Sequence, residues 1–156
     1  MTEIAVSVQA EPRDMDSWQA LARRLETAGF RGLLTGDHPG SGPSPWPALG
    51  AAASVTRTLL LGTYMVQAGV REPVQVAADS ATLDLLAPGR VVLGIGAGHT
   101  PREWEDIGRT RPSPAERAGR LAEFVDVVSR LLRGEQVSCQ GQYLEVRDAR
   151  LEDLHR

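Results

Sequence analysis

The chain has 156 residues, of which 42% are hydrophobic, so it is long enough for one domain with a substantial core. Its 17 basic and 20 acidic residues give a net charge of −3, and the longest basic run is Arg23–Arg24, which argues against nucleic acid and anionic membranes as partners. All 17 basic residues are arginine and Cys139 is the single cysteine, which excludes lysine Schiff-base or P-loop chemistry, an internal disulfide and a CxxC metal or redox site.

The sequence predicts no targeting or membrane segment. The N-terminus lacks a basic region followed by an apolar run, and no apolar stretch approaches the roughly 20 residues of a membrane span. We therefore expect a cytoplasmic protein.

Short apolar segments alternate with helical patterns along the chain, which predicts an α/β protein with a parallel sheet. The apolar segments begin roughly 27 residues apart, the length of one βα unit of a (β/α)8 barrel. A complete barrel of this TIM type takes about 250 residues. We therefore expect a single domain, residues 1–156, with four βα units, or half of a barrel. The predicted strands are Ile4–Val8, Gly32–Thr35, Thr58–Val66 and Val91–Gly94.

The first two predicted helices follow the first two strands. Apolar residues recur at helical spacing from Trp18 to Ala28, with acidic Asp14 near the start and Gly29 after the end, which indicates an amphipathic helix. A Pro- and Gly-rich loop and then an Ala-rich helix around Pro47–Val55 follow the second strand.

The later helices have clear start signals. One begins at Glu72-Pro73, and another begins where Ser113 and Glu116 supply a capping box. A small β-hairpin is expected after the last helix, because two short apolar segments flank Gln140-Gly141. The expected apolar stripes are Val74, Ala77, Ala78, Ala81 and Leu85, and then Ala118, Leu121, Val125, Val128 and Leu132; the hairpin strands are Val137–Cys139 and Tyr143–Val146.

A four-stranded parallel sheet would leave its first and last strands as bare edges. Such edges expose hydrogen-bonding groups and apolar surface that a closed barrel would cover. The pattern therefore predicts association, either as a homodimer or with a partner chain that supplies the missing half-barrel.

Polar residues collect where the second predicted strand ends. Asp37 and His38 follow Thr35-Gly36, and in parallel α/β barrels the ligand site lies at the carboxyl ends of the strands. A histidine exchanges protons near neutral pH, and an aspartate orients it or binds a ligand directly. The alternative is that Asp37 caps a turn and His38 is a solvated loop residue.

Two further strand exits point to the same end of the sheet. Tyr64, Met65 and Val66 could form an apolar wall for a flat ring, or could belong to the core. The segment Gly94–His99 carries alternating glycines that let a ligand approach the backbone closely. A dinucleotide fingerprint would need GxGxxG, and position 99 is histidine, so a Rossmann site is disfavoured.

The loops after the second and fourth strands each contain a tryptophan. Trp46 and Trp104 could close over a substrate or seal the rim of the barrel. Cys139 has no obvious base nearby and is interpreted as structural. We predict no metal site.

Together these segments form a pattern seen in one enzyme family. They are Thr35–His38, Leu61–Val66, Pro88–Gly98, Glu103–Gly108, Pro114–Arg117, Gly134–Ser138 and Gly141–Tyr143. On these motifs, which span nearly the whole chain, the sequence resembles the luciferase-like monooxygenase superfamily, particularly its coenzyme F420-dependent oxidoreductase branch.

The resemblance implies a deazaflavin, F420, or alternatively FMN, across the carboxyl end of the barrel. The ring would lie against Tyr64, Met65 and Val66, where the family often has a non-prolyl cis peptide, here Tyr64-Met65. The residues Gly96, Ala97, Gly98 and His99 would border the cofactor through backbone amides.

The resemblance also implies catalytic roles at the exit of the second strand. Asp37 and His38 would contact the ring or the substrate, His38 would stabilise or protonate the reacting species, and Trp46 would sit beside the substrate. Relatives that act on sugar phosphates place an acidic residue where this chain has His99. Strands five to eight, which bring much of the cofactor's phosphate-binding surface in the family, have no counterpart here.

The function implied is hydride transfer between F420 and a small organic substrate. The alternative, from a different class, is a non-catalytic half-barrel that dimerises or completes the barrel of a partner. Binding of F420 or FMN separates the two hypotheses.

Overall fold

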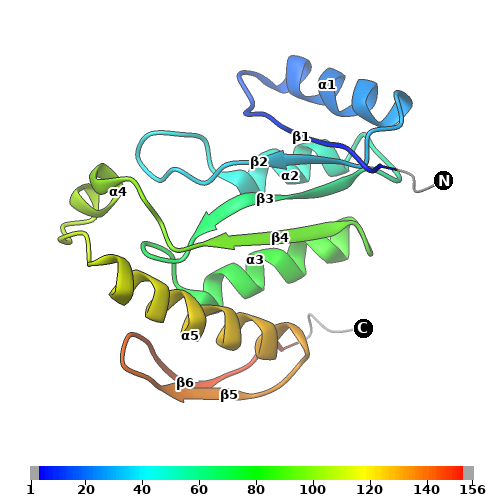
Figure 1. Cartoon of the computed structure of the whole chain (residues 1–156). Coiled ribbons are helices and arrows are strands. Elements are labelled where there is room, and N and C mark those ends of the chain that lie inside the picture. The colour runs from blue at the N-terminus through cyan, green and yellow to red at the C-terminus, as the bar shows by residue number, and fades with distance from the viewer. Residues whose placement is uncertain (1–3, 153–156) are drawn as a thin grey trace.

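One parallel sheet organises the chain in the computed structural model, which describes residues 4–152. Its four strands follow the order β1-β2-β3-β4, so neighbours in sequence are neighbours in the sheet (Figure 1). The predicted α/β architecture with four parallel strands is confirmed. The strands are β1 (Ser7–Gln9), β2 (Gly32–Thr35), β3 (Leu60–Gln67) and β4 (Val91–Gly96).

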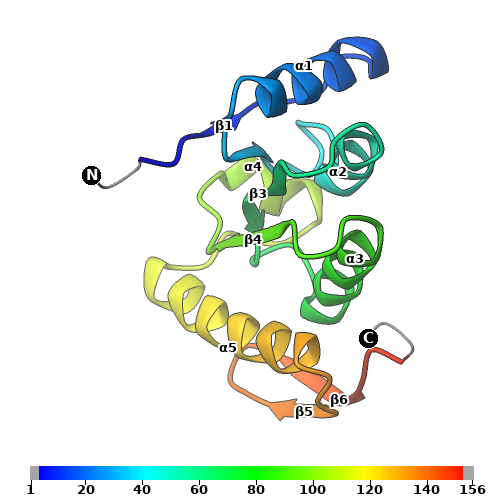
Figure 2. The ribbon, with the colours of Figure 1, turned by 90° about the vertical axis from the view of Figure 1, so that its right-hand side faces the viewer.

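Three helices cover one side of this sheet (Figure 2). They are α1 (Met15–Thr27), α2 (Pro45–Ala53) and α3 (Pro73–Leu86). The side chains of Leu33 on β2 and Leu61 on β3 are fully buried and belong to one apolar cluster with Trp18 of α1. Burial of this cluster fixes α1 and α2 against the sheet.

The opposite face of the sheet is open in the described chain. Val92 of β4 pairs with Gly62 of β3, and a Cβ on Gly62 would collide with Val92, so both lie on this face. Val92 is 39% exposed and Met65 is 46% exposed. A layer of glycine and exposed apolar side chains therefore lines the side of the sheet that would be the inside of a barrel.

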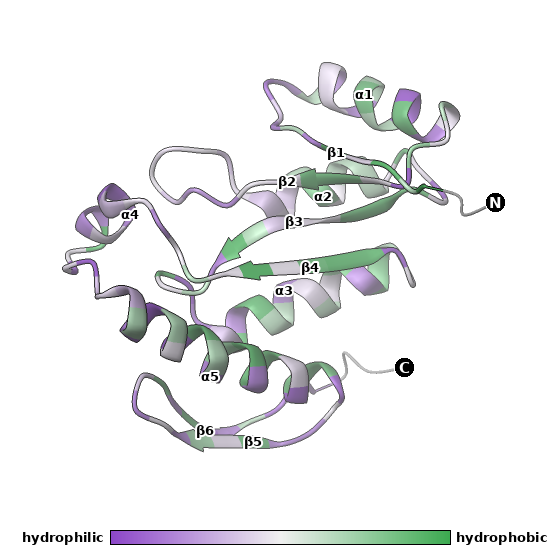
Figure 3. Ribbon diagram, in the orientation of Figure 1, coloured by the Kyte–Doolittle hydropathy of each residue, from purple (hydrophilic) through white to green (hydrophobic). Residues whose placement is uncertain are grey.

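The C-terminal third packs against α3 and the β4 side of the sheet, where Val66 of β3 and Ile95 of β4 belong to or pack against the same apolar cluster as Phe124 of α5. Helix α5 (Pro114–Leu132) lies between α3 and the hairpin formed by β5 (Val137–Gln140) and β6 (Glu145–Ala149) (Figure 1). The guanidinium of Arg120 donates to the carbonyls of Ala68 and Tyr143 at 2.9 and 3.0 Å, which joins the β3 exit to the hairpin. The strands β2, β3 and β4 are mostly apolar, whereas the short helix α4 (Pro101–Asp106) is hydrophilic (Figure 3).

Several predicted boundaries and stripes are wrong in detail. The first strand begins at Ser7 rather than Ile4, and β3 runs from Leu60 to Gln67 rather than from Thr58 to Val66. Leu85 and Val125 are 38% and 39% exposed, because the buried stripes of α3 and α5 run through neighbouring positions. The buried residues are Pro73, Val76, Ala77, Ser80, Ala81 and Leu83 on α3, and Phe124, Val127, Val128 and Leu131 on α5.

The start signals of the helices are confirmed. Asp14 caps α1 by accepting from the backbone N–H of Ser17, and Ser113 and Glu116 form the predicted capping box of α5. Helix α2 begins at Pro45, two residues before the predicted start. No helix of the described residues is long and apolar enough to cross a membrane.

Glu26 at the end of α1 holds the segment that leads into β3. Its Oε1 accepts from the backbone N–H groups of Arg57, Thr58 and Leu59 at 2.8, 2.6 and 2.9 Å. These bonds, that of Thr58 first, lower the pKa of the Glu26 carboxyl to about 2. The charged carboxylate therefore stabilises the folded chain.

Replacement of Glu26 by glutamine should lower the free energy of unfolding by about 1–2 kcal/mol at pH 7, since solvent screening reduces the effect of a partly exposed charge. The folded pKa is depressed, so the stabilisation is complete above the ordinary pKa of about 4.5 and is lost as pH falls toward 2. Urea denaturation at pH 7 and pH 3 measures the difference. Glu105→Gln, at an exposed position, is the control; an equal loss in both variants would contradict the assignment.

Candidate active site

The three predicted strand exits meet at one end of the sheet, where the strands point in Figure 1. The carboxylate of Asp37, after β2, accepts from the backbone N–H of Gln67 at the end of β3 at 3.2 Å. Gln67 in turn lies against Gly98 after β4, because a Cβ on Gly98 would overlap its side-chain amide. The predicted convergence of the exits is therefore confirmed.

Asp37 forms a buried ion pair rather than a pair with His38. Its side chain is 1% exposed, and its two oxygens accept from Nη2 and Nε of Arg71 at 2.6 and 3.1 Å. The hydrogen bonds with Asp37 raise the pKa of the Arg71 guanidinium. Of the two roles predicted for Asp37, that of orienting His38 is wrong, because Arg71 and the Gln67 amide occupy its oxygens. Direct contact of Asp37 with a ligand stays a prediction.

His38 is held instead by Glu103 of α4. Nδ1 of the imidazole lies 2.6 Å from Oε1 of Glu103, and Oε2 of the same carboxylate accepts from Nε2 of Gln67. The side chain of Glu103 is 2% exposed, whereas that of His38 is 39% exposed. The arrangement is a buried carboxylate that presents an imidazole to the open end of the sheet.

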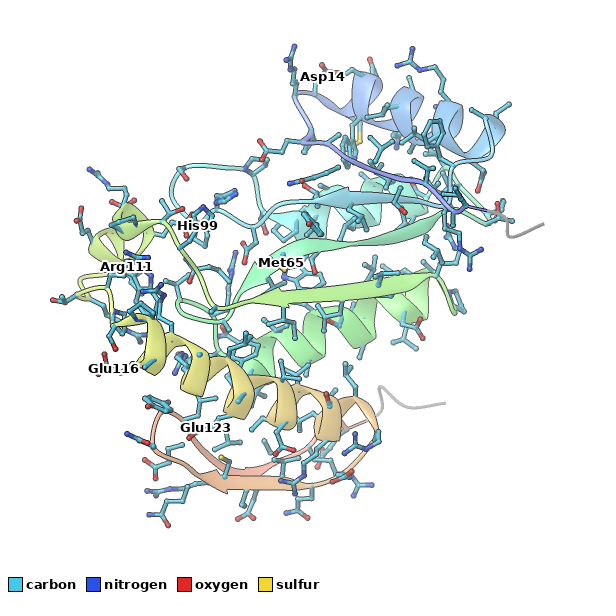
Figure 4. All side chains as sticks on the ribbon, viewed as in Figure 1. Asp14, Met65, His99, Arg111, Glu116 and Glu123 are labelled. Atoms are coloured by element: carbon cyan, nitrogen blue, oxygen red, sulfur yellow. The ribbon has the colours of Figure 1, made fainter. Side chains whose placement is uncertain are left out.

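The second histidine of this region lies beside the first. His99 is exposed in the segment between β4 and α4 (Figure 4), and its ring meets that of His38 edge to face with centroids 6.3 Å apart. Two imidazoles from separate strand exits therefore border the same opening.

The two tryptophans lie in helices, and the prediction of loop positions is wrong. Trp46 is in the first turn of α2, half-buried against both apolar clusters. Trp104 in α4 is 2% exposed, and its ring fills the space that a Cβ on Gly69 would need. Trp104 therefore packs α4 against the β3 exit, and a contact between Trp46 and a substrate stays a prediction.

Strand β3 exposes two apolar side chains in the middle of a buried run. Tyr64 and Met65 are 55% and 46% exposed, whereas Thr63 and Val66 on either side are 1% and 0% exposed. The peptide bond between Tyr64 and Met65 is cis, as the family resemblance implies. The side chain of Val66 belongs to the core and adds no exposed apolar surface at the strand end, so a contact between Val66 and the ring stays a prediction.

The glycine run after β4 borders this exposed pair. A Cβ on Gly96 would lie 3.0 Å from Cε of Met65, so the thioether side chain rests on the glycine backbone. Gly98 has φ of +78°, a conformation that favours glycine. The side chain of Met65 and the segment Gly96–His99 thus form one surface at the strand ends (Figure 4).

A family model described as luciferase-like monooxygenase matches residues 1–154. The chain belongs to the luciferase-like monooxygenase family. The family resemblance that the motifs predicted is thereby confirmed, and the sheet of the described residues is the first part of a TIM-type barrel.

Relatives within the family include F420-dependent and oxygenating enzymes. The chain is 38% identical to an F420-dependent glucose-6-phosphate dehydrogenase of Beutenbergia cavernae, over 96% of this chain and 46% of that relative. It is 36% identical to a 4-hydroxyprotoasukamycin monooxygenase of Streptomyces nodosus subsp. asukaensis, over 85% and 36% of the two chains. The luciferase-like chain thus spans about half the length, or less, of the curated relatives it matches.

A solved structure with the same fold is an F420-dependent secondary alcohol dehydrogenase in complex with an F420-acetone adduct. It superposes with a TM-score of 0.84 at 28% identity, over 97% of this chain and 49% of that one. The likeness places the four-stranded sheet as one half of such a barrel.

Sequence reasoning on this luciferase-like chain missed three site residues. Gln67, Arg71 and Glu103 hold the two residues that were predicted, Asp37 and His38. Glu103 is the first residue of the segment Glu103–Gly108, which matched the family pattern, and that match was the available signal. No spacing rule pairs it with a histidine 65 positions earlier.

Proposed function

We propose that this chain provides the ring-binding half of an F420-dependent oxidoreductase site, which passes a hydride between the deazaflavin and a small organic substrate. The observation that carries the proposal is the exposed apolar surface of Tyr64 and Met65, with the His38 imidazole held at the same end of the sheet. The relatives named above support F420 over FMN, which is the alternative cofactor.

The residues at the strand ends fit a flat ring. Apolar side chains in the middle of a central strand are ordinarily buried, and the exposure of Met65 leaves 46% of its surface for a ligand to cover. The side chains of Met65 and Gln67 lie directly on the backbone of Gly96 and Gly98. The backbone of the segment Gly96–His99 beside them would offer N–H donors to the edge of the ring. This combination suits a heteroaromatic ring with polar edges.

The chain's own residues would orient the ring and move a proton. Bound F420 supplies hydride chemistry, and the protein supplies position and electrostatics. His38 is the proton carrier, because its imidazole is exposed on one edge and fixed by Glu103 on the other. In the oxidation of an alcohol, His38 would accept the hydroxyl proton, and bound F420 would be the acceptor of the hydride from the same carbon.

The open edges of the sheet favour association, with a second copy in a homodimer or with a partner chain whose strands extend the barrel. Strands β1 and β4 each pair with one neighbour among the described residues, so each has a free edge. Val6 and Val92, on or beside these edges, are 52% and 39% exposed. A second set of strands would cover both the edges and the apolar face.

The visible spectrum and elution volume after mixing with F420, and separately with FMN, test the proposal. A red-shifted or quenched F420 band that follows the protein through gel filtration is the expected result. Binding of FMN alone would reassign the cofactor. A stable dimer that binds neither at micromolar concentration would favour the non-catalytic half-barrel instead.

Met65→Ala should weaken F420 binding by about tenfold, because it removes one of the two exposed apolar side chains proposed to lie beneath the ring. Met15→Ala is the matched control, since Met15 is also exposed, at 60%, but lies at the start of α1. Fluorescence titration of F420 measures both affinities. Equal affinities in the two variants would remove Met65 from the binding surface.

A further inference from the structure

Among residues 4–152, no arginine forms an ion pair with the buried carboxylate of Glu103. Its side chain is 2% exposed, and its hydrogen bonds within the described residues come from the His38 imidazole and the Gln67 amide. Burial of a charge is costly unless donors satisfy it. Both donors approach from strand exits, so the carboxylate links β2 and β3 to α4.

We propose that Glu103 is a positioning residue that fixes the tautomer of His38: it accepts the Nδ1 proton and leaves Nε2 as the atom that exchanges a proton with the substrate. An ionised carboxylate only accepts hydrogen bonds, so the proton in the 2.6 Å contact belongs to Nδ1. The role of Nε2 in proton exchange with the substrate rests on the proposed oxidoreductase function. The assignment of the Nδ1 proton is independent of that function.

Asp37 does not take this role. It precedes His38 in sequence, yet its oxygens are occupied by Arg71 and the backbone of Gln67. Glu103 therefore orients the imidazole from a separate helix, and Gln67 holds Glu103 in turn. A short network replaces the adjacent Asp-His pair that the sequence suggested.

The other edge of the ring is free for a ligand. Nε2 of His38 has no hydrogen-bond partner among residues 4–152, and the side chain is 39% exposed. The His38 imidazole lies close to Gly36, where an added Cβ would be 3.3 Å from Cδ2 and 3.5 Å from Nε2 of His38. The lack of a side chain at Gly36 thus leaves room for the ring in this orientation.

The fixed tautomer determines which proton transfer is possible. A neutral imidazole protonated at Nδ1 presents a lone pair at Nε2. This lone pair would accept the hydroxyl proton of a substrate whose carbinol carbon gives up a hydride to a bound deazaflavin. The resulting imidazolium is stabilised by the Glu103 carboxylate. In the reverse direction, the same Nε2–H returns its proton to the carbonyl oxygen.

Ring 15N NMR of the cofactor-free chain tests the tautomer directly. The His38 signals are assigned by their loss in His38→Ala, and spectra are recorded at alkaline pH, where imidazoles are neutral. We expect Nδ1 to carry the proton in the natural chain. In Glu103→Gln, the Gln67 amide engages the new carbonyl, so the new NH2 faces Nδ1 and moves the proton to Nε2; Glu103→Ala removes the acceptor altogether.

Glu105→Gln is the matched control, because Glu105 lies exposed on the same helix. It should leave the His38 signals unchanged. If Nδ1 remains the protonated nitrogen in both Glu103 variants, or if it carries no proton in the natural chain, the assignment is overturned. Circular dichroism confirms that the variants compared are folded.

Kinetics of the assembled enzyme test the catalytic part. Glu103→Gln should lower kcat about 10- to 100-fold with little change in KM, because the substrate still binds while the proton acceptor is misplaced. If the His38 tautomer changes in the Glu103 variants but the protein binds no F420, the proposed function is overturned and the tautomer assignment stands. Full activity of Glu103→Gln would overturn the positioning role.

Discussion

Asp37→Asn is expected to lower the free energy of unfolding by about 3 kcal/mol. The carboxylate is 1% exposed and receives two hydrogen bonds from Arg71 and one from the Gln67 backbone. Removal of one member of a buried ion pair leaves the other charge without its partner, which typically costs about 3–5 kcal/mol. Arg71 retains access to solvent, with 29% of its side chain exposed, so the lower end of that range applies.

Asp106→Asn provides the control for this experiment. Asp106 also accepts from an arginine at 2.6 Å, but its partner Arg102 is 74% exposed. A surface pair contributes about 0–1 kcal/mol, so the control should change stability little. Urea denaturation of both variants measures the difference. A loss below about 1 kcal/mol in Asp37→Asn would show that the buried pair does not hold the β3 exit.

Helix starts, strand β2 and the buried face of α1 were predictable from the sequence, because each depends on residues close together in the chain. The capping box at Ser113 and Glu116 involves residues three positions apart, and strand β2 has the predicted bounds. The apolar spacing of α1 placed Trp18 and Leu25 in the core, where both are buried. Each of these features is decided within a few turns or residues of chain.

Helix α4 was missed because it is six residues long and has no repeating apolar stripe. The buried side of such a short helix is set by tertiary contacts. Glu103 is buried because its carboxylate contacts the His38 imidazole and accepts from the Gln67 amide. Trp104 is buried because its ring fills the space beside Gly69. Nothing within α4 itself encodes those partners.

The location of the candidate site was predicted from the sequence, whereas the hydrogen-bond and ion-pair partners of its residues were not. The sequence placed Asp37 and His38 at a strand exit, and both are there. Adjacent residues at a turn point their side chains to different neighbours, however, so Asp37 meets Arg71 and His38 meets Glu103. The pairs join residues 34 and 65 positions apart, a distance over which single-sequence patterns carry no pairing information.

His38 is expected to be the residue whose loss costs the most activity. Both His38→Ala and His38→Asn should lower kcat by about 10²–10⁴-fold, the usual contribution of a general acid or base. The two variants differ in stability. An asparagine amide near the position of Nδ1 still donates to Glu103, whereas alanine leaves the buried carboxylate one donor short, at a cost of about 1–3 kcal/mol.

His99→Ala is the matched control, because His99 lies at the same opening but is not held by a carboxylate in the described structure. Its loss should lower kcat less than tenfold. Steady-state kinetics with F420, together with F420 titration and thermal unfolding of each variant, separate chemistry from binding and stability. If His38→Asn binds F420 normally, is as stable as the natural chain and keeps kcat within tenfold, then proton transfer runs through another group, and His99 becomes the first candidate.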